Sequence, residues 1–303
     1  MFNNLIGNTE NKETLKNMID SNNISHSYIF SGTSGIGKFE FAKEFAKAII
    51  CLSETEPKPC NHCKACESFD NSNNPDIIII DENEDSIKTE TIKELTNNIL
   101  EKPIQGNKKI YIINNSENMT KEAQNSILKT LEEPPEYAII ILITSNENLL
   151  LNTIKSRCIR IPFSKLTDNE LKEYFGRTGQ TINVDMIKAF GGSIEKALKI
   201  KDKQEIYQRI QDTFNNLENL NELQILNIKD TISSDKDEIY YVLDYINTIF
   251  LSKIVNDISN TQKYEKCIEI IEETKQRLKR NSNYDMTIDN CLFALERSLK
   301  ING

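Results

Sequence analysis

The sequence predicts a parallel α/β sheet domain followed by a region that is entirely helical. In the first 165 or so residues, five short apolar runs without alternation are separated by helical patterns. Such runs are typical of parallel strands covered on both faces. A glycine-rich loop follows the first run, and after Phe163 only helical spacing remains. Strand–helix alternation of this kind implies one sheet with right-handed crossovers.

We expect one strand at each apolar run, giving a five-stranded sheet. The runs occupy residues 27–30, 77–80, 110–113, 138–143 and 159–161. A helix is expected from Thr120, a residue type suited to the N-cap, with Ala123, Ile127, Leu128 and Leu131 on one face. Pro134 and Pro135 cannot continue it, so the helix should end just before them.

The region after the sheet should form short helices and then longer ones. A "GGS" stretch at 191–193 punctuates the short segments. Further on, apolar residues at helical spacing form two stripes, which must pack on each other or on another chain. Their members are Ile239, Leu243, Ile246 and Phe250, and then Ile288, Leu292, Leu295 and Leu299. The expected domains are residues 1–164, 165–203 and 204–303.

Composition excludes several classes of protein. The 303 residues are 38% hydrophobic and 27% charged, as in an ordinary soluble globular chain. No apolar run approaches the roughly 18 residues of a membrane span, and the N-terminus lacks the features of a signal peptide. We therefore expect a cytoplasmic protein with no membrane partner. The net charge of −9 argues against non-specific nucleic-acid binding by the chain as a whole.

The glycine-rich loop "GTSGIGKF" resembles a phosphate-binding loop until its last position. Gly32, Gly35 and Gly37 follow a predicted strand and open a helix near Lys38, so backbone N–H groups and the helix N-terminus face an anion. The next position usually carries a Ser or Thr that ligates Mg²⁺, but here it is Phe39. Descent from a phosphate-binding loop is indicated, whereas ATP binding is doubtful.

Hydrolysis would also need carboxylates beside the loop, one for Mg²⁺ and one to orient water. The strand at 110–113 is followed by Asn114 and Asn115, whose neutral amides cannot replace them. The acidic run "DENED" at 81–85 is a competing placement, but its strand should lie at the sheet edge, away from the loop. Two losses in one site predict that this chain does not hydrolyse ATP.

Four cysteines have the spacing C-x8-C-x2-C-x2-C. Cys51, Cys60, Cys63 and Cys66 lie in a polar insertion at 51–66. Four thiolates suit tetrahedral Zn²⁺ in a closed structural site, which would fold a loop too small for its own core. Unligated cysteines, an iron–sulfur cluster and a redox C-x-x-C pair remain alternatives, and His62 could replace one ligand.

The stretch "IKSRCIRI" at 154–161 places Arg157 just before a predicted strand. A guanidinium on a short turn is exposed and rigidly placed. On the residues alone, an ordinary surface arginine is the favoured interpretation.

Together these motifs resemble the bacterial DNA polymerase III clamp loader, an AAA+ family. The resemblance rests on "HSYIFSGTSGIGK", the four-cysteine insertion, "NSILKTLEEPPE" at 125–136, "ILITSN" at 141–146 and "SRC" at 156–158, in that order. It covers roughly residues 1–200. In this family the gamma/tau subunits hydrolyse ATP, whereas the delta-prime type is degenerate in both ATPase motifs and keeps "SRC". This chain is similar to the delta-prime type; an ATP-hydrolysing gamma/tau-type subunit is the alternative.

The resemblance implies roles for individual residues. Arg157 would be an arginine finger, reaching the γ-phosphate held by a neighbouring subunit. Asn146 falls where the family senses that phosphate, and Lys196 falls near the family's lid arginine. The helical segments would form a lid and a collar. The partners implied are gamma/tau and delta subunits in a ring within the polymerase holoenzyme, with the sliding clamp and primed DNA.

Overall fold

The computed structural model describes most of the chain, with a few gaps. The described residues are 1–54, 57–81, 86–179, 187, 190–201, 203–220, 224–225, 228, 232, 239–280 and 282–300. The chain divides into two compact units. The first contains Met1–Gln180 with Gly192–Glu195, and the second contains Thr181–Gly191 with Lys196–Gly303.

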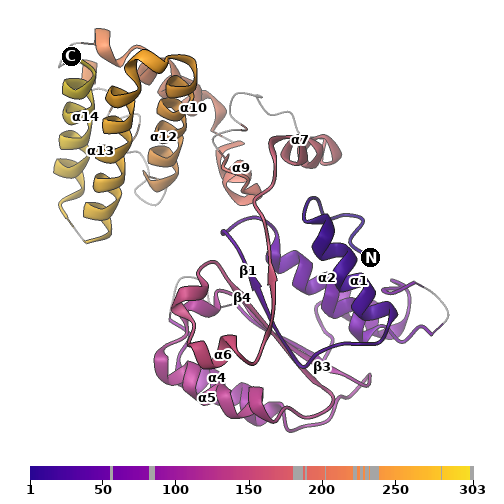
Figure 1. Ribbon diagram of the computed structural model, residues 1–303. Coiled ribbons are helices and arrows are strands. Elements are labelled where there is room, and N and C mark those ends of the chain that lie inside the picture. Colours follow the sequence, from indigo (N-terminus) through magenta and orange to yellow (C-terminus); the bar gives the residue numbers. More distant parts are fainter. Residues whose placement is uncertain are drawn as a thin grey trace. The chain divides into compact units, whose positions relative to one another are not determined.

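The first unit is built on a five-stranded sheet in which all pairs are parallel, in the order β2-β3-β4-β1-β5 (Figure 1). The predicted strands are confirmed. Their bounds are β1 Ser27–Ser31, β2 Ile77–Ile80, β3 Lys109–Ile113, β4 Ala138–Thr144 and β5 Ile159–Pro162. Because β2 is an edge strand, two strands, β3 and β4, separate the start of the acidic run from β1 and its loop.

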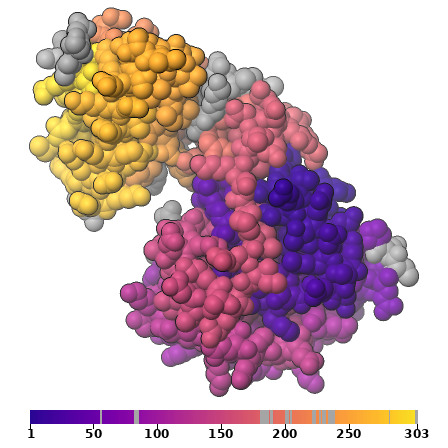
Figure 2. Space-filling view, viewed as in Figure 1, coloured from indigo at the N-terminus to yellow at the C-terminus, as the bar shows by residue number. Residues whose placement is uncertain are grey.

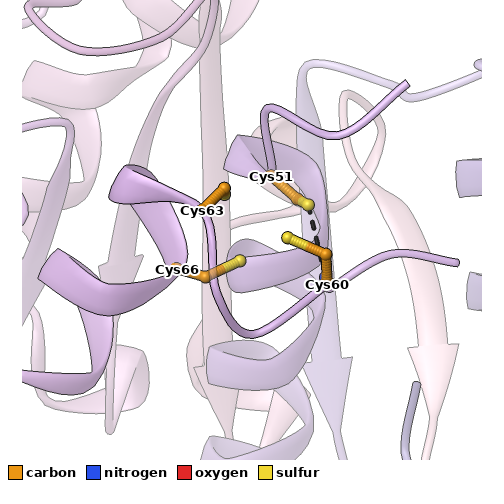
Figure 3. A group of neighbouring side chains, drawn as sticks. All are labelled: Cys51, Cys60, Cys63 and Cys66. Atoms are coloured by element: carbon orange, nitrogen blue, oxygen red, sulfur yellow. Dashed lines mark hydrogen bonds between the residues drawn. The ribbon is translucent and has the colours of Figure 1, made fainter. Parts of the chain in front are cut away.

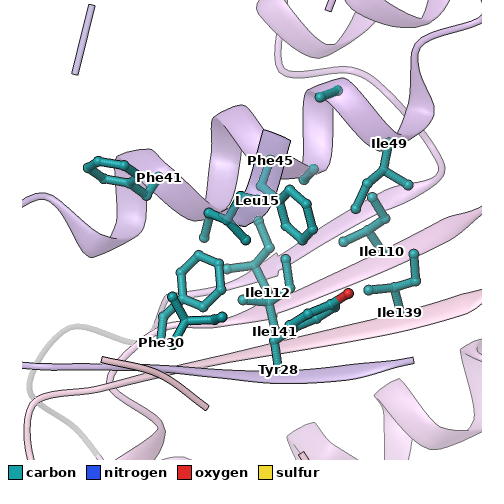
Figure 4. Close-up of a cluster of buried hydrophobic side chains, with 14 of the residues drawn as sticks. Leu15, Tyr28, Phe30, Phe41, Phe45, Ile49, Ile110, Ile112, Ile139 and Ile141 are labelled. Atoms are coloured by element: carbon teal, nitrogen blue, oxygen red, sulfur yellow. The ribbon is translucent and has the colours of Figure 1, made fainter. Parts of the chain in front are cut away.

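Helices cover both faces of this sheet. Alternate strand side chains point to opposite faces. One face packs Tyr28, Phe30, Ile112 and Ile141 against α1 and α2 (Figure 4), and the other packs Tyr111 and its neighbours against α4 and α5. The bounds of the unit's helices are α1 Thr9–Asp20, α2 Lys38–Ile50, α3 Lys64–Asp70, α4 Thr89–Asn98, α5 Lys121–Glu132, α6 Asn152–Lys155 and α7 Asp168–Arg177, with short 3₁₀ turns η1 Ser116–Asn118 and η2 Glu147–Leu149.

The helix predicted from Thr120 is confirmed as α5. The Thr120 hydroxyl accepts a hydrogen bond of 3.1 Å from the backbone N–H of Ala123, as an N-cap does. The helix ends at Glu132, before the two prolines. Both ends of α5 are therefore fixed by residues that the sequence makes visible.

The start of the chain is tied to the residues that follow the last strand. Asn8 exchanges hydrogen bonds with Ser164, and the Asn11 amide donates to the Pro162 carbonyl at 2.8 Å. The two segments adjoin on the surface of the first unit, indigo beside pink (Figure 2). These contacts close the edge of the unit next to β5.

The described part of the second unit is all helical. Its helices are α10 Gln204–Asn215, α12 Ile239–Asn256, α13 Thr261–Lys279 and α14 Tyr284–Lys300, with η4 Leu217–Asn219 and η6 Ile258–Asn260; α9 Ile194–Lys201 begins in the first unit. Both predicted apolar stripes are buried here, so they pack within the chain itself. Among the described residues, no helix has the length and apolarity that crossing a membrane requires.

Candidate functional site

The phosphate-type loop lies between β1 and α2, as the sequence predicts. Gly35 and Gly37 have φ of 75° and 92°, where a side chain would be strained, and Gly37 is the N-cap of α2. A Cβ on Gly32 would lie 2.4 Å from the Phe163 carbonyl oxygen. The fold therefore needs these glycines whether or not a phosphate binds.

Lys38 is turned onto its own loop. Its side chain is buried, and Nζ donates to the carbonyl oxygens of Gly32 at 2.5 Å and Thr33 at 2.8 Å. Burial lowers the pKa of Lys38 to about 8, while the carboxylates of Glu117 and Glu195 oppose the shift. The lysine that could reach a phosphate already has internal partners.

The segment Gly192–Glu195 lies directly on the loop. The carbonyl oxygen of Gly35 accepts hydrogen bonds from the backbone N–H groups of Ile194 at 2.8 Å and Glu195 at 3.3 Å. The Ser34 hydroxyl donates to a Glu195 carboxylate oxygen at 3.5 Å. A Cβ on Gly35 would lie 2.2 Å from the Ser193 hydroxyl oxygen. This segment therefore covers the loop and brings a negative charge to it.

Phe39 stands where a metal-binding hydroxyl would be. Its ring packs against the hydrophobic core under α2, and the Lys43 ammonium lies 4.9 Å from the ring centroid. The side chain is thus part of the packing between helix and sheet. An aromatic ring has no atom that can ligate Mg²⁺.

Of the two asparagines after β3, Asn114 forms its side-chain hydrogen bond away from the loop. The Asn114 amide donates to the Asp81 carboxylate at 2.8 Å, and Asn115 takes a left-handed conformation with φ of 49°. Asp81 is the first residue of the competing acidic run, and positions 82–85 lie outside the described residues. The contacts of Asn114 join the ends of β3 and β2 rather than β3 and the loop.

Glu117 is a carboxylate near the loop that the sequence analysis missed. It lies in η1, and its Oε1 accepts hydrogen bonds from the backbone N–H and hydroxyl of Ser145, just after β4. Its Oε2 is buried and, in the part of the chain that the structure describes, has no hydrogen-bond partner. Asn114, Asn115 and the acidic run at 81–85 were weighed from the sequence; the available signal for Glu117 was an acidic residue two positions beyond Asn115.

Arg157 lies on the turn between α6 and β5, and its backbone is anchored there. The Ser27 hydroxyl donates to the Arg157 carbonyl oxygen at 2.7 Å, which ties the turn to β1. The side chain is exposed. Its Nη1 donates to the Thr153 carbonyl oxygen at 2.8 Å, and Nη2 lies 2.5 Å from the Glu132 carboxylate. The guanidinium thus has a defined orientation at the surface.

Asn146 and Lys196 have structural contacts. Asn146 is the N-cap of η2 and accepts a hydrogen bond from the Asn148 backbone N–H. Lys196 forms an ion pair with Asp244 of α12, and Lys275 of α13 lies 2.6 Å from the same carboxylate. Burial opposes ionisation of Asp244, but the two lysines outweigh it and lower its pKa. Lys196 thus takes part in the packing of the second unit.

The four predicted cysteines come together in one cluster. Cys51 is the C-cap of α2, Cys60 lies in the loop that follows, and Cys63 and Cys66 begin α3 (Figure 3). Their sulfur atoms all lie within 4.8 Å of one another. The Cys60 backbone N–H donates to the Cys51 sulfur at 3.4 Å. His62 is not part of the cluster, and its Nδ1 lies 2.8 Å from the Cys60 carbonyl oxygen.

The cluster fits a tetrahedral metal ion. Zn–S bonds of about 2.3 Å place the sulfurs of a tetrahedron about 3.8 Å apart, within the observed limit. Burial of Cys63 opposes its ionisation, yet backbone N–H groups of Cys66 and Leu52 and the nearby thiols lower its pKa to about 6. Burial and neighbouring thiols raise the pKa of Cys66. Only a cation would allow all four thiols to ionise together.

The fold and loop define a class of protein: a parallel α/β domain with a phosphate-type loop after its first strand and a helical region behind it. The family model described as DNA polymerase III, delta subunit, matches residues 7–167, more than half of the chain. The chain belongs to this family.

Curated relatives carry related names. The chain is 33% identical over 210 residues to the DNA polymerase III subunit tau/gamma of Haemophilus influenzae, covering 67% of this chain and 30% of that protein. It is 36% identical over 159 residues to the DNA polymerase III subunit delta' of Bacillus subtilis, covering 52% of this chain and 48% of that protein. The chain thus spans less than half the length of either relative.

A solved structure supports the fold. The crystal structure of a DNA polymerase III gamma subunit-related protein from Thermotoga maritima aligns with 94% of this chain and 99% of its own, with a TM-score of 0.50 and 18% identity. At this identity the likeness concerns the fold alone. The shared architecture is a five-stranded parallel sheet with a C-terminal helical region, as expected.

Proposed function

We propose that this chain is a delta-prime-type subunit of the bacterial DNA polymerase III clamp loader. In this role it completes a ring with gamma/tau-type and delta subunits, and the ring places the sliding clamp on primed DNA. Family membership supports the proposal, as do relatives named tau/gamma and delta'. The chain itself hydrolyses no ATP and contributes to a holoenzyme whose other subunits do.

The observation that carries the proposal is the state of the phosphate-type loop. Phe39 provides no metal ligand, Lys38 bonds to its own loop, and residues 192–195 lie over Gly35. Each feature opposes turnover by a different route: no Mg²⁺ ligand, no free ammonium for a phosphate, and no open loop. A loop kept in this form serves the fold rather than a reaction.

Arg157 is the residue that this chain contributes to the ATP site of the neighbouring subunit. The guanidinium is exposed on an anchored turn, while the chain's own loop lacks the parts that a nearby arginine would assist. A γ-phosphate on the adjacent subunit offers the planar, bidentate acceptor that guanidinium geometry matches. An arginine finger accelerates phosphoryl transfer by about 10³–10⁵.

The cysteine cluster has a structural role in this proposal. Zn²⁺ held by Cys51, Cys60, Cys63 and Cys66 would staple the end of α2 to the start of α3. The domain division at residues 164 and 203 belongs to the same proposal, with an AAA+ core, a helical lid and a helical collar. The compact units divide the chain differently: residues 165–180 and Gly192–Glu195, which belong to the expected lid, lie in the same unit as the core.

Two observations favour the second candidate, an ATP-hydrolysing gamma/tau-type subunit. Glu117 brings a carboxylate into the electrostatic field of Lys38, so the site does not lack acids altogether. Relatives named tau and gamma are also similar over a longer stretch than the delta' relative. Against this, Glu117 is held by Ser145, and no hydroxyl stands at position 39.

The test is ATP turnover by reconstituted rings that carry Arg157→Ala or Arg157→Lys. Both variants should fold and assemble, yet lower the ATPase rate measured with clamp and primed DNA. Lysine should fail because an ammonium is a point charge without the planar fork. The loss should be partial, since only one interface receives Arg157. Wild-type rates in both rings would show that Arg157 is an ordinary surface arginine.

A further inference from the structure

The last turn of α5 carries two adjacent carboxylates that differ in their contacts. Glu132 lies 2.5 Å from Nη2 of Arg157, whereas the Glu133 side chain makes no hydrogen bond or ion pair among the described residues. Both side chains are exposed, and Pro134 and Pro135 follow. The two side chains carry the same charge and are adjacent at the C-terminal end of α5. Only Glu132 touches the guanidinium.

The Arg157 side chain is held at both of its terminal nitrogens. Nη1 donates to the Thr153 carbonyl oxygen at 2.8 Å and to the Ser156 hydroxyl at 3.3 Å, and Nη2 donates to Glu132. A guanidinium has five N–H donors. These contacts engage three of them, which leaves two for an incoming ligand. The side chain is therefore oriented before any ligand arrives, and it still has donors to offer.

The Glu132–Arg157 pair contributes little to folding. The two side chains are 48% and 32% exposed, and exposed ion pairs are weak because water and salt screen them. Its effect is to restrict a long side chain that would otherwise sample many rotamers on a surface turn. Restricting a group to its productive geometry lowers the cost of reaching the transition state.

We propose that Glu132 is a positioning residue, which orients the Arg157 guanidinium so that its remaining donors face the γ-phosphate on the neighbouring subunit. The proposal rests on the function assigned to Arg157 above. In this role Glu132 contacts neither the nucleotide nor the water molecule that attacks it. It acts through Arg157 alone, so substituting Glu132 should have no effect on the rate once Arg157 has been removed.

A double-mutant cycle in reconstituted rings tests whether the effect of Glu132 depends on Arg157. The rings carry Glu132→Ala, Glu132→Gln, Arg157→Ala, or Glu132→Ala with Arg157→Ala, and Glu133→Ala is the matched control. With clamp and primed DNA present, Glu132→Ala should lower kcat at the interface by about two- to fivefold with KM unchanged. Glu132→Gln should have a smaller effect in the same direction, and Glu133→Ala should match wild type.

The decisive comparison is the double variant. If Glu132 works through Arg157, the double variant has the kcat of Arg157→Ala alone. Additive losses would show a structural effect, and a rate at or above wild type in Glu132→Ala would show no positioning; either result overturns the proposal. Should Glu132→Ala rings fail to assemble, Glu132→Gln decides on the same terms. A wild-type kcat in Arg157→Ala rings would instead overturn the function proposed for Arg157.

Discussion

The ammonium group of Lys38 binds carbonyl oxygens of its own loop, in the position where a phosphate-binding loop would bind a phosphate. In its place at the start of α2, it donates to two carbonyl oxygens of the loop, with the carboxylates of Glu117 and Glu195 close enough to favour its charge. The effect of burial is larger than that of the two carboxylates, and it lowers the pKa of Lys38 to about 8. The residue is thus a structural lysine whose protonation is linked to folding.

This linkage gives a prediction about pH. The folded pKa of about 8 lies below the ordinary 10.5, so between these values the unfolded chain binds more protons than the folded one. Stability from Lys38 should therefore rise with pH across that range. The free energy of unfolding of wild type, relative to Lys38→Met, should increase from pH 8 to pH 10 in denaturant titrations.

The control for this experiment is Lys16→Met, a change at an exposed lysine of α1. Its difference from wild type should stay constant over the same range. A constant difference for Lys38→Met as well would contradict the prediction.

At the scale of single residues, the sequence predicted positions better than contacts. The glycines of the loop and the four cysteines were found because their spacing is dictated by backbone conformation and metal geometry. The contacts of Lys196 with Asp244, and of Glu117 with Ser145, join residues far apart in the chain. No local spacing marks such pairs, so the sequence could name neither.

At the scale of elements, the cysteine cluster should hold one Zn²⁺ per chain. The metal would link the C-cap of α2 to the first turn of α3 through four sulfur ligands. Cys63→Ser should release the metal, because a serine hydroxyl is a poor zinc ligand, and should expose the insertion to proteases. Metal analysis of protein purified without chelator, followed by limited proteolysis, measures both effects.

Two controls accompany the metal analysis. His62→Ala should keep its zinc, since His62 lies outside the cluster. Cys158→Ser should also keep it, because Cys158 lies outside the cluster as well. Wild-type protein that contains no zinc would overturn the prediction.

The strands and α5 could be predicted because each has a strong local cause. Buried parallel strands appear as unbroken apolar runs, and α5 has an N-cap at one end and prolines at the other. The two stripes of the second unit were recognised as helical faces, but what covers them was left open. Whether an apolar face meets its own chain or another depends on tertiary packing, and here it meets its own.

At the scale of the whole molecule, the purified chain should show no Mg²⁺-dependent ATP hydrolysis above background. The absence of a hydroxyl at Phe39 and the covered loop both act against it. Steady-state turnover of the chain alone, compared with Lys38→Ala, is the measurement. Activity that survives Lys38→Ala would indicate a contaminant. Activity that this substitution abolishes would favour the gamma/tau-type alternative.

At the same scale, two hydrogen bonds that cover the phosphate-type loop involve no side chain. Gly35 is linked to Ile194 and Glu195 through main-chain atoms alone. Nearly any residue can therefore occupy positions 194 and 195 without breaking this link, and only proline, which lacks the N–H, would remove a donor. The closed loop is consequently robust to genetic drift. Sequences of this kind could diverge widely around the loop while its shape is inherited unchanged.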